Sequence, residues 1–328
     1  MTELSLTCDH GGDWAEVRLD AAMLGKLGAQ VQVVDGAGSV LPSQLDRDGD
    51  AATVVVRTRD MTGDRLTLSP GDPQTPAQIA VQTVQEWEGQ ESYRIQTSAC
   101  DWIYHKFGGG FASLIDPEGR DWIGFRPYGG SDGIYRGIPN CAYPENVFHP
   151  GHHTCQTQAA RVGPLRVTLD TASNDGKWAA RWHIYPDHAE LTIRKFGHPY
   201  WLLYEGTPGG KLDEAHDFCI RSDGLRRPLS ERWDEELPAP KWIGFGKDGV
   251  DRVLWLHSHA PEHQACRDSF WPMEQNMTVF GFGRVGMDMT MSHAPARFTV
   301  GLTQLADTGD LAGAVQAITT RSTLGLAR

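Results

Sequence analysis

The sequence predicts an all-β protein of antiparallel strands with a short helix near its C-terminus. Short runs alternate apolar and polar residues, as in AEVRLD and DRLTLS, and this period of two is typical of half-buried strands. Turn sequences such as DGAG at 35–38 and NDGK at 174–177 separate the runs. Helical spacing stands out only in the tail, where Leu311, Val315 and Ile318 fall on one face.

Taken in order, the first strands cover residues 4–70 and end at PGDPQTP, which reads as a hinge. We therefore expect a small N-terminal β-strand region at 1–76, packed on a main domain at 77–328. In the main domain, strands at 102–106 and 111–115 precede a β-turn at DPEG, and 121–126 is expected to pair back as a third strand. Further strands are expected within 160–171, 177–196, 199–210, 241–246, 252–259, 277–284 and 296–302. The stretch 212–240 is mixed and charged, and RWDEELPAPKW at 232–242 is expected to be a surface loop.

Residues 128–155 form a long irregular segment. Glycine and proline interrupt it too often for a helix or strand. It nevertheless carries three histidines, one arginine and several aromatic residues. Long segments of this composition are usually functional loops on a rigid scaffold. The alternative is an ordered connection whose aromatic side chains pack beneath it.

Composition narrows the class of protein. The formal net charge of −12 argues against binding to nucleic acid or an anionic membrane, which would favour a basic face. No apolar run is long enough to cross a bilayer, and the start shows no signal peptide. The six cysteines form no CxxC pair. We therefore expect a cytoplasmic protein with reduced thiols.

The stretch YRIQTSACDWIYHKFGGGFASLIDPEGRDWIGF has a rhythm that resembles the galactose mutarotase-like β-supersandwich. This superfamily includes aldose epimerases and the sandwich domains of many glycoside hydrolases and polysaccharide lyases. The resemblance covers about residues 80–305 and implies an antiparallel β-supersandwich with a carbohydrate substrate. In the epimerases two histidines and a late glutamate act at C1, but that motif does not map onto this chain residue by residue.

The central segment supplies candidates for acid–base chemistry. His149, His152 and His153 lie in HPGHH, four residues after Glu145, and histidine is the usual proton shuttle near neutral pH. The spacing is a weak metal signal, because it lacks the helical HExxH pattern. The alternative is that these histidines are solvent-facing or packed loop residues. Arg136, between glycines, could clamp a carboxylate, as could Arg126 and Arg284.

Other candidates lie on expected strands. His105 points away from its neighbours Tyr104 and Lys106, so only one side of this trio can face a cleft. Glu205 follows the apolar run YWLLY and could be a partly desolvated base. Tryptophans could stack on the apolar face of a sugar ring, although most of them in β-sandwiches belong to the core. The catalytic candidates are His105, Tyr135, Arg136, His149, His152 and Glu205, and the substrate-binding candidates are Tyr104, Lys106, Tyr128, Glu145, His153, His263, Trp271 and Arg284.

These residues favour a carbohydrate lyase that abstracts a proton and performs β-elimination, since a base, an acid and a neutraliser of the enolate are all present. The alternatives are an aldose 1-epimerase, a glycoside hydrolase or a non-catalytic carbohydrate-binding protein. Hydrolysis is less favoured because it needs two facing carboxylates, and only Glu205 and Glu145 are candidates. The favoured reaction requires no cofactor. Binding of a divalent metal by the histidines of the central segment stays open as an alternative.

Overall fold

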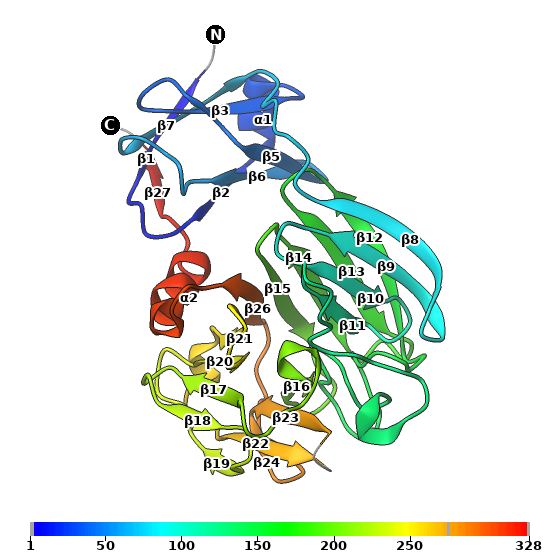
Figure 1. Cartoon of the computed structure of the whole chain (residues 1–328). Coiled ribbons are helices and arrows are strands. Elements are labelled where there is room, and N and C mark those ends of the chain that lie inside the picture. The colour runs from blue at the N-terminus through cyan, green and yellow to red at the C-terminus, as the bar shows by residue number, and fades with distance from the viewer. Residues whose placement is uncertain (1–2, 274–275, 327–328) are drawn as a thin grey trace. The chain divides into compact units, whose positions relative to one another are not determined.

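The computed structural model describes residues 3–273 and 276–326 (Figure 1). Strands hold 49% of the residues and helices 9%, which confirms the all-β prediction. The chain divides into two units, which are described separately. The first comprises Met1–Ile79, Arg161–Val167 and Gly313–Arg328, and the second comprises Ala80–Ala160 and Thr168–Ala312. The sequence predicted a single boundary after residue 76. It did not predict that Arg161–Val167 and Gly313–Arg328 belong to the first unit.

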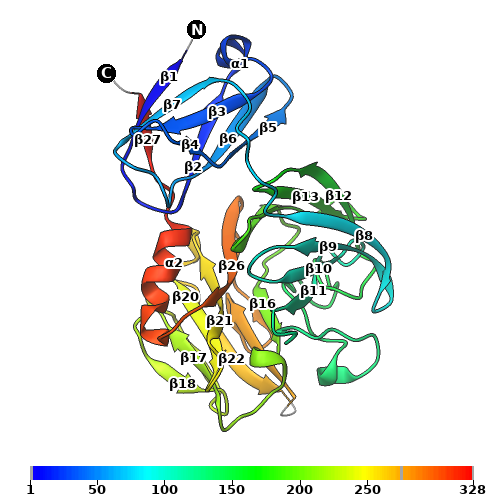
Figure 2. The ribbon, with the colours of Figure 1, turned by 45° about the horizontal axis from the view of Figure 1, so that its top comes forward.

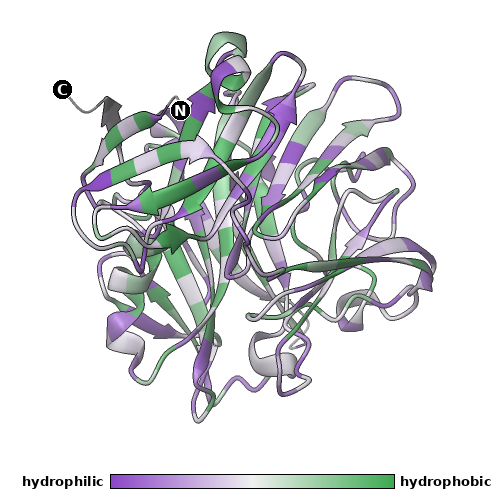
Figure 3. Cartoon of the chain, turned by 90° about the horizontal axis from the view of Figure 1, so that it is seen from above, coloured by the Kyte–Doolittle hydropathy of each residue, from purple (hydrophilic) through white to green (hydrophobic). Residues whose placement is uncertain are grey.

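The first unit contains two antiparallel sheets (Figure 2). A five-stranded sheet has the order β27-β1-β7-β3-β4, formed by β1 (Leu4–Cys8), β3 (Val31–Asp35), β4 (Val40–Leu41), β7 (Arg65–Pro70) and β27 (Leu324–Leu326). A three-stranded sheet has the order β2-β6-β5, formed by β2 (Trp14–Leu19), β5 (Ser43–Asp48) and β6 (Ala51–Arg57). Along such strands apolar and polar residues alternate, as Figure 3 shows by colour, because one face of each strand packs in the core.

A short helix, α1 (Ala21–Leu27), was not predicted from the sequence. Its start is fixed by Asp20, whose side chain accepts a hydrogen bond from the backbone N–H of Met23 at 2.8 Å. Leu24 and Leu27 are its buried residues. With only seven residues, the helix is too short to show a clear helical period between two strands.

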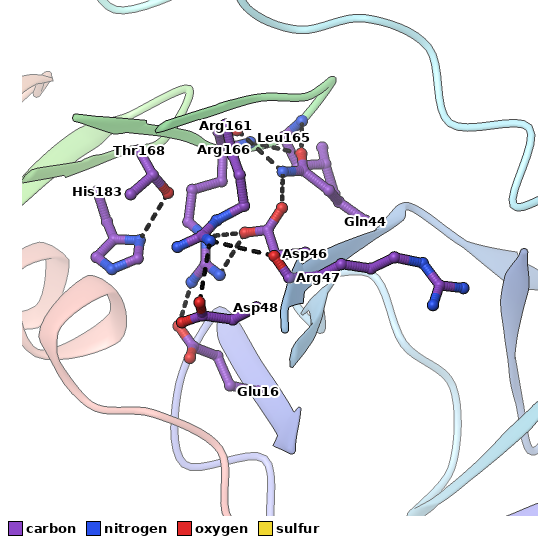
Figure 4. Close-up of polar contacts among 10 residues, drawn as sticks. All are labelled: Glu16, Gln44, Asp46, Arg47, Asp48, Arg161, Leu165, Arg166, Thr168 and His183. Carbon is purple, nitrogen blue, oxygen red and sulfur yellow. Dashed lines mark hydrogen bonds and ion pairs between the residues drawn. The ribbon is translucent and has the colours of Figure 1, made fainter. Parts of the chain in front are cut away.

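The segment 161–167 is held in the first unit by a buried polar cluster (Figure 4). The Gln44 side-chain oxygen accepts hydrogen bonds from the backbone N–H groups of Leu165 and Arg166, both at 2.8 Å. The Arg166 guanidinium pairs with Asp46 and, at 2.9 Å, with Glu16. Because Gln44, Asp46 and Arg166 are buried and satisfied by one another, the cluster fixes a contact between segments far apart in sequence.

The second unit contains most of the remaining strands. One four-stranded sheet has the order β11-β10-β9-β8, formed by β8 (Ala80–Trp87), β9 (Gln90–Gln96), β10 (Asp101–His105) and β11 (Gly110–Ile115). A nine-stranded sheet has the order β12-β13-β14-β15-β26-β21-β20-β17-β18, formed by β12 (Cys155–Val162), β13 (Val167–Ser173), β14 (Ala179–Ile184), β15 (His188–Lys195), β17 (Asp217–Arg221), β18 (Arg226–Pro228), β20 (Trp242–Lys247), β21 (Arg252–Ser258) and β26 (Ala296–Gln304). A second four-stranded sheet has the order β16-β23-β22-β19, formed by β16 (Leu202–Gly206), β19 (Trp233–Glu235), β22 (Asp268–Met273) and β23 (Met277–Phe282), and β24 (Arg284–Val285) pairs with β25 (Asp288–Met289).

Aromatic contacts join these sheets into a sandwich. Phe111 on β11 lies with its ring centroid 4.7 Å from that of Trp182 on β14, which brings the first four-stranded sheet onto the nine-stranded one. Tyr204 on β16 lies 5.1 Å from Phe245 on β20, which does the same for the second four-stranded sheet. Such pairs bury large apolar areas and add a geometric preference. The C-terminal helix α2 (Leu311–Thr319) confirms the predicted tail helix. Within residues 3–273 and 276–326, neither helix is long and apolar enough to span a membrane.

Two sequence predictions of local structure were wrong. Residues 121–126 form no strand, since the Asp121 carboxylate accepts the backbone N–H groups of Leu114 and Ile123 in place of regular pairing. The stretch 232–242 is not wholly a surface loop, because Trp233–Glu235 form β19. Glu235 of β19 pairs with Arg227 of β18 at 2.9 Å, and these two strands belong to different sheets.

Candidate active site

A cavity of about 390 Å³ in the second unit collects several of the predicted site residues. The four-stranded sheet β16-β23-β22-β19 provides one wall, and the central segment 128–155 provides much of the other. Its lining residues are Ile134, Tyr135, Asn140, Tyr143, Asn146, His149, His152, Trp201, Leu203, Glu205, Trp271, Pro272, Met273, Val279, Arg284 and Met287.

The wall formed by the sheet follows from strand alternation. Trp201, Leu203 and Glu205 are two residues apart along β16 and its approach, so all three face the cavity. In the sheet register Glu205 lies opposite Val279, and Val279 lies opposite Trp271. The carboxylate is therefore set in an apolar and aromatic surface, and Glu205 is only 6% exposed.

The central segment is attached to the strand that carries Glu205. The backbone of Gly137 exchanges two hydrogen bonds with that of Glu205, at 2.8 and 3.0 Å, and Leu203 N–H donates to Asn140 O at 3.1 Å. A Cβ atom at Gly137 would lie 2.5 Å from the Pro150 side chain, so only glycine allows this close approach. Backbone pairing thus places Asn140 and the histidines of the segment over the sheet.

His149 and Glu205 form a buried acid–base pair. The His149 Nε2 atom lies 3.3 Å from Glu205 Oε2, and Asn140 Nδ2 donates to the same oxygen at 3.4 Å. The other ring nitrogen of His149, Nδ1, lies 2.7 Å from the carbonyl oxygen of Pro150. Both ring nitrogens therefore face acceptors, and only the doubly protonated imidazolium can donate to both.

The pKa of His149 is raised above its ordinary value by this environment. Burial alone lowers it, but the hydrogen bond and negative charge of Glu205, together with the backbone carbonyls of Tyr135 and Pro150, outweigh burial. His152 behaves in the opposite way: burial, and then the charges of His149 and His153, lower its pKa to about 4. The cavity therefore holds two histidines whose pKa values are shifted in opposite directions, with ring centroids 5.0 Å apart.

Arg284 brings a positive charge to the same cavity. Its guanidinium carbon lies 3.9 Å from the centroid of the Trp271 ring, and Nε donates to Gly286 O at 3.0 Å. Burial lowers its pKa to about 10, so it stays cationic at neutral pH. Arg284 is only 5% exposed, and within the described part of the chain its buried Nη1 has no hydrogen-bond partner. A buried, incompletely paired guanidinium is suited to an anionic group on a ligand.

Three predicted residues of β10 and the turn after it lie outside the cavity. The Tyr104 hydroxyl is buried and bonded to Thr171 at 2.7 Å, and Lys106 pairs with Glu91. His105 is fully buried, and burial lowers its pKa to about 3. It nevertheless reaches the site indirectly, because its Nδ1 accepts the N–H of Gly151 at 3.0 Å. The carbonyl of that same peptide group is the Pro150 oxygen that binds His149.

The remaining candidates are distributed as follows. Glu145 Oε2 lies 3.4 Å from His198 Nε2. The His153 ring stacks on Phe107, and the buried His263 ring stacks on Phe298. Tyr128 is 90% exposed, and Arg136 lines a separate cavity. Of the fourteen candidates, the cavity unites Tyr135, His149, His152, Glu205, Trp271 and Arg284.

Asn140 is a site residue that sequence reasoning missed. Nothing in IPNC marks its asparagine, whose position depends on the pairing of the central segment with β16. Tyr143, Asn146 and Met287 also line the cavity and were missed, because single polar or apolar loop residues give no pattern. Over residues 3–273 and 276–326, no three His, Cys, Asp or Glu side chains gather closely enough to hold a metal ion.

Comparison with known proteins gives little further guidance. No protein-family model matches the sequence, and a search of curated proteins finds no match. Among solved structures the chain is similar to one described as "Crystal Structure Analysis of HI1317", with a TM-score of 0.46 and 13% sequence identity, covering 69% of this chain and 99% of that one. Functional inference therefore rests on the cavity around Glu205.

Proposed function

We propose that this chain is an enzyme that interconverts the anomers of an acidic sugar by general acid–base catalysis. The observation that carries the proposal is the buried contact of 3.3 Å between His149 and Glu205 at the wall of the cavity. One group is a base and the other an acid, and both reach the same small volume. The two reacting oxygens of a cyclic hemiacetal, the C1 hydroxyl and the ring oxygen, are bonded to one carbon and so lie in such a volume.

The proposed steps balance without a further reactant. Glu205 accepts the proton of the C1 hydroxyl while the His149 imidazolium donates its Nε2 proton to the ring oxygen, and the bond between C1 and the ring oxygen breaks. The open-chain aldehyde then rotates about its C1–C2 bond. Ring closure on the other face of the carbonyl returns both protons and gives the other anomer. The raised pKa of His149 supports its role as the acid at neutral pH.

The rest of the cavity supports a sugar that carries a negative charge. Trp201 offers an aromatic surface of the kind on which the apolar face of a pyranose stacks, whereas the Trp271 ring already contacts the guanidinium groups of Arg284 and Arg232, at 3.9 and 3.6 Å from its centroid. Arg284 offers its guanidinium to a carboxylate or phosphate group, and Asn140 has a buried side-chain oxygen with no hydrogen-bond partner in the described part of the chain. We also propose a cytoplasmic location, which the free thiol state of all six cysteines supports.

A second candidate is the β-elimination favoured from the sequence. Arg284 supports it, since elimination beside a carboxylate needs a cation to stabilise the enolate, and Tyr135 could assist in proton transfer. Hydrolysis has less support, because Glu205 is the only carboxylate lining the described part of the cavity.

One experiment separates the candidates. NMR exchange spectroscopy measures the rate of exchange between the two anomers of glucuronate and, separately, of glucose. Elimination is measured with a uronate oligosaccharide, from the ultraviolet absorbance of the unsaturated product. We expect faster anomer exchange with glucuronate than with glucose and no absorbance change. Absorbance growth without faster exchange would instead establish elimination, and neither signal on a broad sugar panel would contradict both reactions.

A further inference from the structure

A second cavity of the second unit has a charge opposite to that of the whole chain. It has a volume of about 330 Å³, and its lining includes Arg126, Arg136, Lys211 and one carboxylate, Asp132. Three positive side chains against one negative one are notable in a chain whose formal net charge is −12. A concave surface that concentrates positive charge attracts small anions.

Arg136 is fixed at this cavity by its own hydrogen bonds. Its Nε donates to Ser131 O and its Nη2 donates to Asn276 O, both at 2.9 Å, and its side chain is only 11% exposed. Burial lowers the pKa of Arg136, the charges of Tyr204, Asp132 and Asp121 raise it, and the positive charge of Arg126 lowers it. Asp132 Oδ1 lies 3.9 Å from Arg136 Nη2 and balances part of its charge, and an anion bound beside the guanidinium would further offset the cost of its burial.

Thr207 gives an independent indication of a ligand. It lines the same cavity and is 2% exposed, and its buried hydroxyl has no hydrogen-bond partner among the described residues. An unsatisfied buried hydroxyl costs free energy unless something binds to it. A hydroxyl that lines the same cavity as three cationic side chains is a suitable donor to an oxyanion.

We propose that this cavity is an anion-binding site for a carboxylate or phosphate group, held by Arg126, Arg136, Lys211 and the Thr207 hydroxyl. The site is separate from the Glu205 cavity, and the inference does not depend on the proposed reaction. It gives a role to Arg136, which lies outside the cavity of His149 and Glu205.

Inorganic phosphate is the probe for a direct test. Phosphate is titrated calorimetrically at constant ionic strength into the wild-type chain and into Thr207→Val, Lys211→Gln and the control Arg194→Gln. Arg194 is an exposed arginine that lies 3.6 Å from Asp170, so its variant removes one positive charge elsewhere. We expect a phosphate site whose Kd is raised about three- to tenfold in Thr207→Val and Lys211→Gln and unchanged in Arg194→Gln.

Further measurements locate the anion and its source. An anomalous signal from selenate in soaked crystals should lie between Arg136 and Lys211, and Arg284→Met should retain phosphate binding. Titration in saturating glucuronate distinguishes two sources: lost phosphate binding would assign the site to the acidic group of a sugar, and retained binding would assign it to a separate anion. No phosphate binding, equal affinity in all variants, or binding lost only in Arg284→Met would overturn the proposal.

Discussion

Replacing Glu205 by glutamine should abolish most activity while leaving the fold nearly as stable. At an effective dielectric constant of about 20, two unit charges 3.3 Å apart attract by about 5 kcal/mol. Desolvation of the two buried charges costs several kcal/mol each and offsets this attraction. The substitution removes the attraction and one desolvation cost together, so these two terms largely cancel.

The remaining histidine can also adapt to the change. Without the carboxylate, burial dominates and His149 becomes neutral, keeping its Nδ1 proton on Pro150 O. Its Nε2 can then accept a hydrogen bond from the new amide, although it still faces the Tyr135 carbonyl oxygen at 3.1 Å, so no buried charge is left unpaired. We expect the free energy of unfolding to change by less than about 2 kcal/mol, whereas kcat should fall about 10²- to 10⁴-fold through loss of the base.

The assay combines anomer exchange by NMR, thermal unfolding and an NMR titration of the His149 ring. Glu145→Gln is the matched control, because Glu145 also lies close to a histidine, His198 at 3.4 Å, but is half exposed and outside the cavity. We expect the control to keep its activity. The reasoning is refuted if Glu205→Gln retains activity within about threefold of wild type, if stability falls in proportion to activity, or if the His149 pKa does not drop.

Four other outcomes follow from the same contacts. His153→Ala should be almost silent in anomer exchange, because this ring lies outside the cavity, whereas His152→Ala should reduce turnover; equal effects would contradict the placement. Since the pKa of His149 is raised, the protonated acid persists above pH 6.5, and kcat/KM should fall only as pH rises through the raised value. Arg284→Met should raise KM for glucuronate about tenfold or more and leave KM for glucose nearly unchanged, as steady-state kinetics would show. Because the pKa of His105 is lowered to about 3, stability should fall as pH drops below 6.5, by up to about 1.4 kcal/mol per pH unit, and urea unfolding of His105→Asn should show a shallower dependence.

Strand alternation made the fold class predictable, but the ends of several elements depend on side-chain contacts that the sequence does not reveal. The alternation in AEVRLD or DRLTLS survives in the structure because one face of each strand is buried. Two of the failures occurred where a polar side chain replaces a backbone partner. Asp121 does so at 121–126, and Gln44 does so for the segment 161–167. Each contact joins residues whose proximity is a result of folding.

The candidate site was predictable in its chemical types and only partly in its members. Glu205 and the HPGHH histidines could be selected because ionisable residues at the end of an apolar strand or in a glycine- and proline-rich loop are unusual. Asn140 could not, because it meets Glu205 only through the pairing of the central segment with β16. Arg136 was selected together with its neighbour Tyr135, but the two residues line different cavities.

The contrast between His105 and His149 shows why the protonation state of a buried histidine requires the structure. Both rings are almost fully buried, and burial alone would make both neutral. The peptide group between Pro150 and Gly151 gives the two rings opposite hydrogen-bond partners. Its N–H donates to His105 Nδ1, whereas its carbonyl oxygen lies 2.7 Å from His149 Nδ1. A ring nitrogen that accepts a proton donor must itself be unprotonated, and one that faces a carbonyl must carry a proton. The same peptide group therefore favours the neutral form of His105 and, together with the Glu205 carboxylate, the cationic form of His149. His105 thus holds the peptide group whose carbonyl faces His149, even though it does not line the cavity.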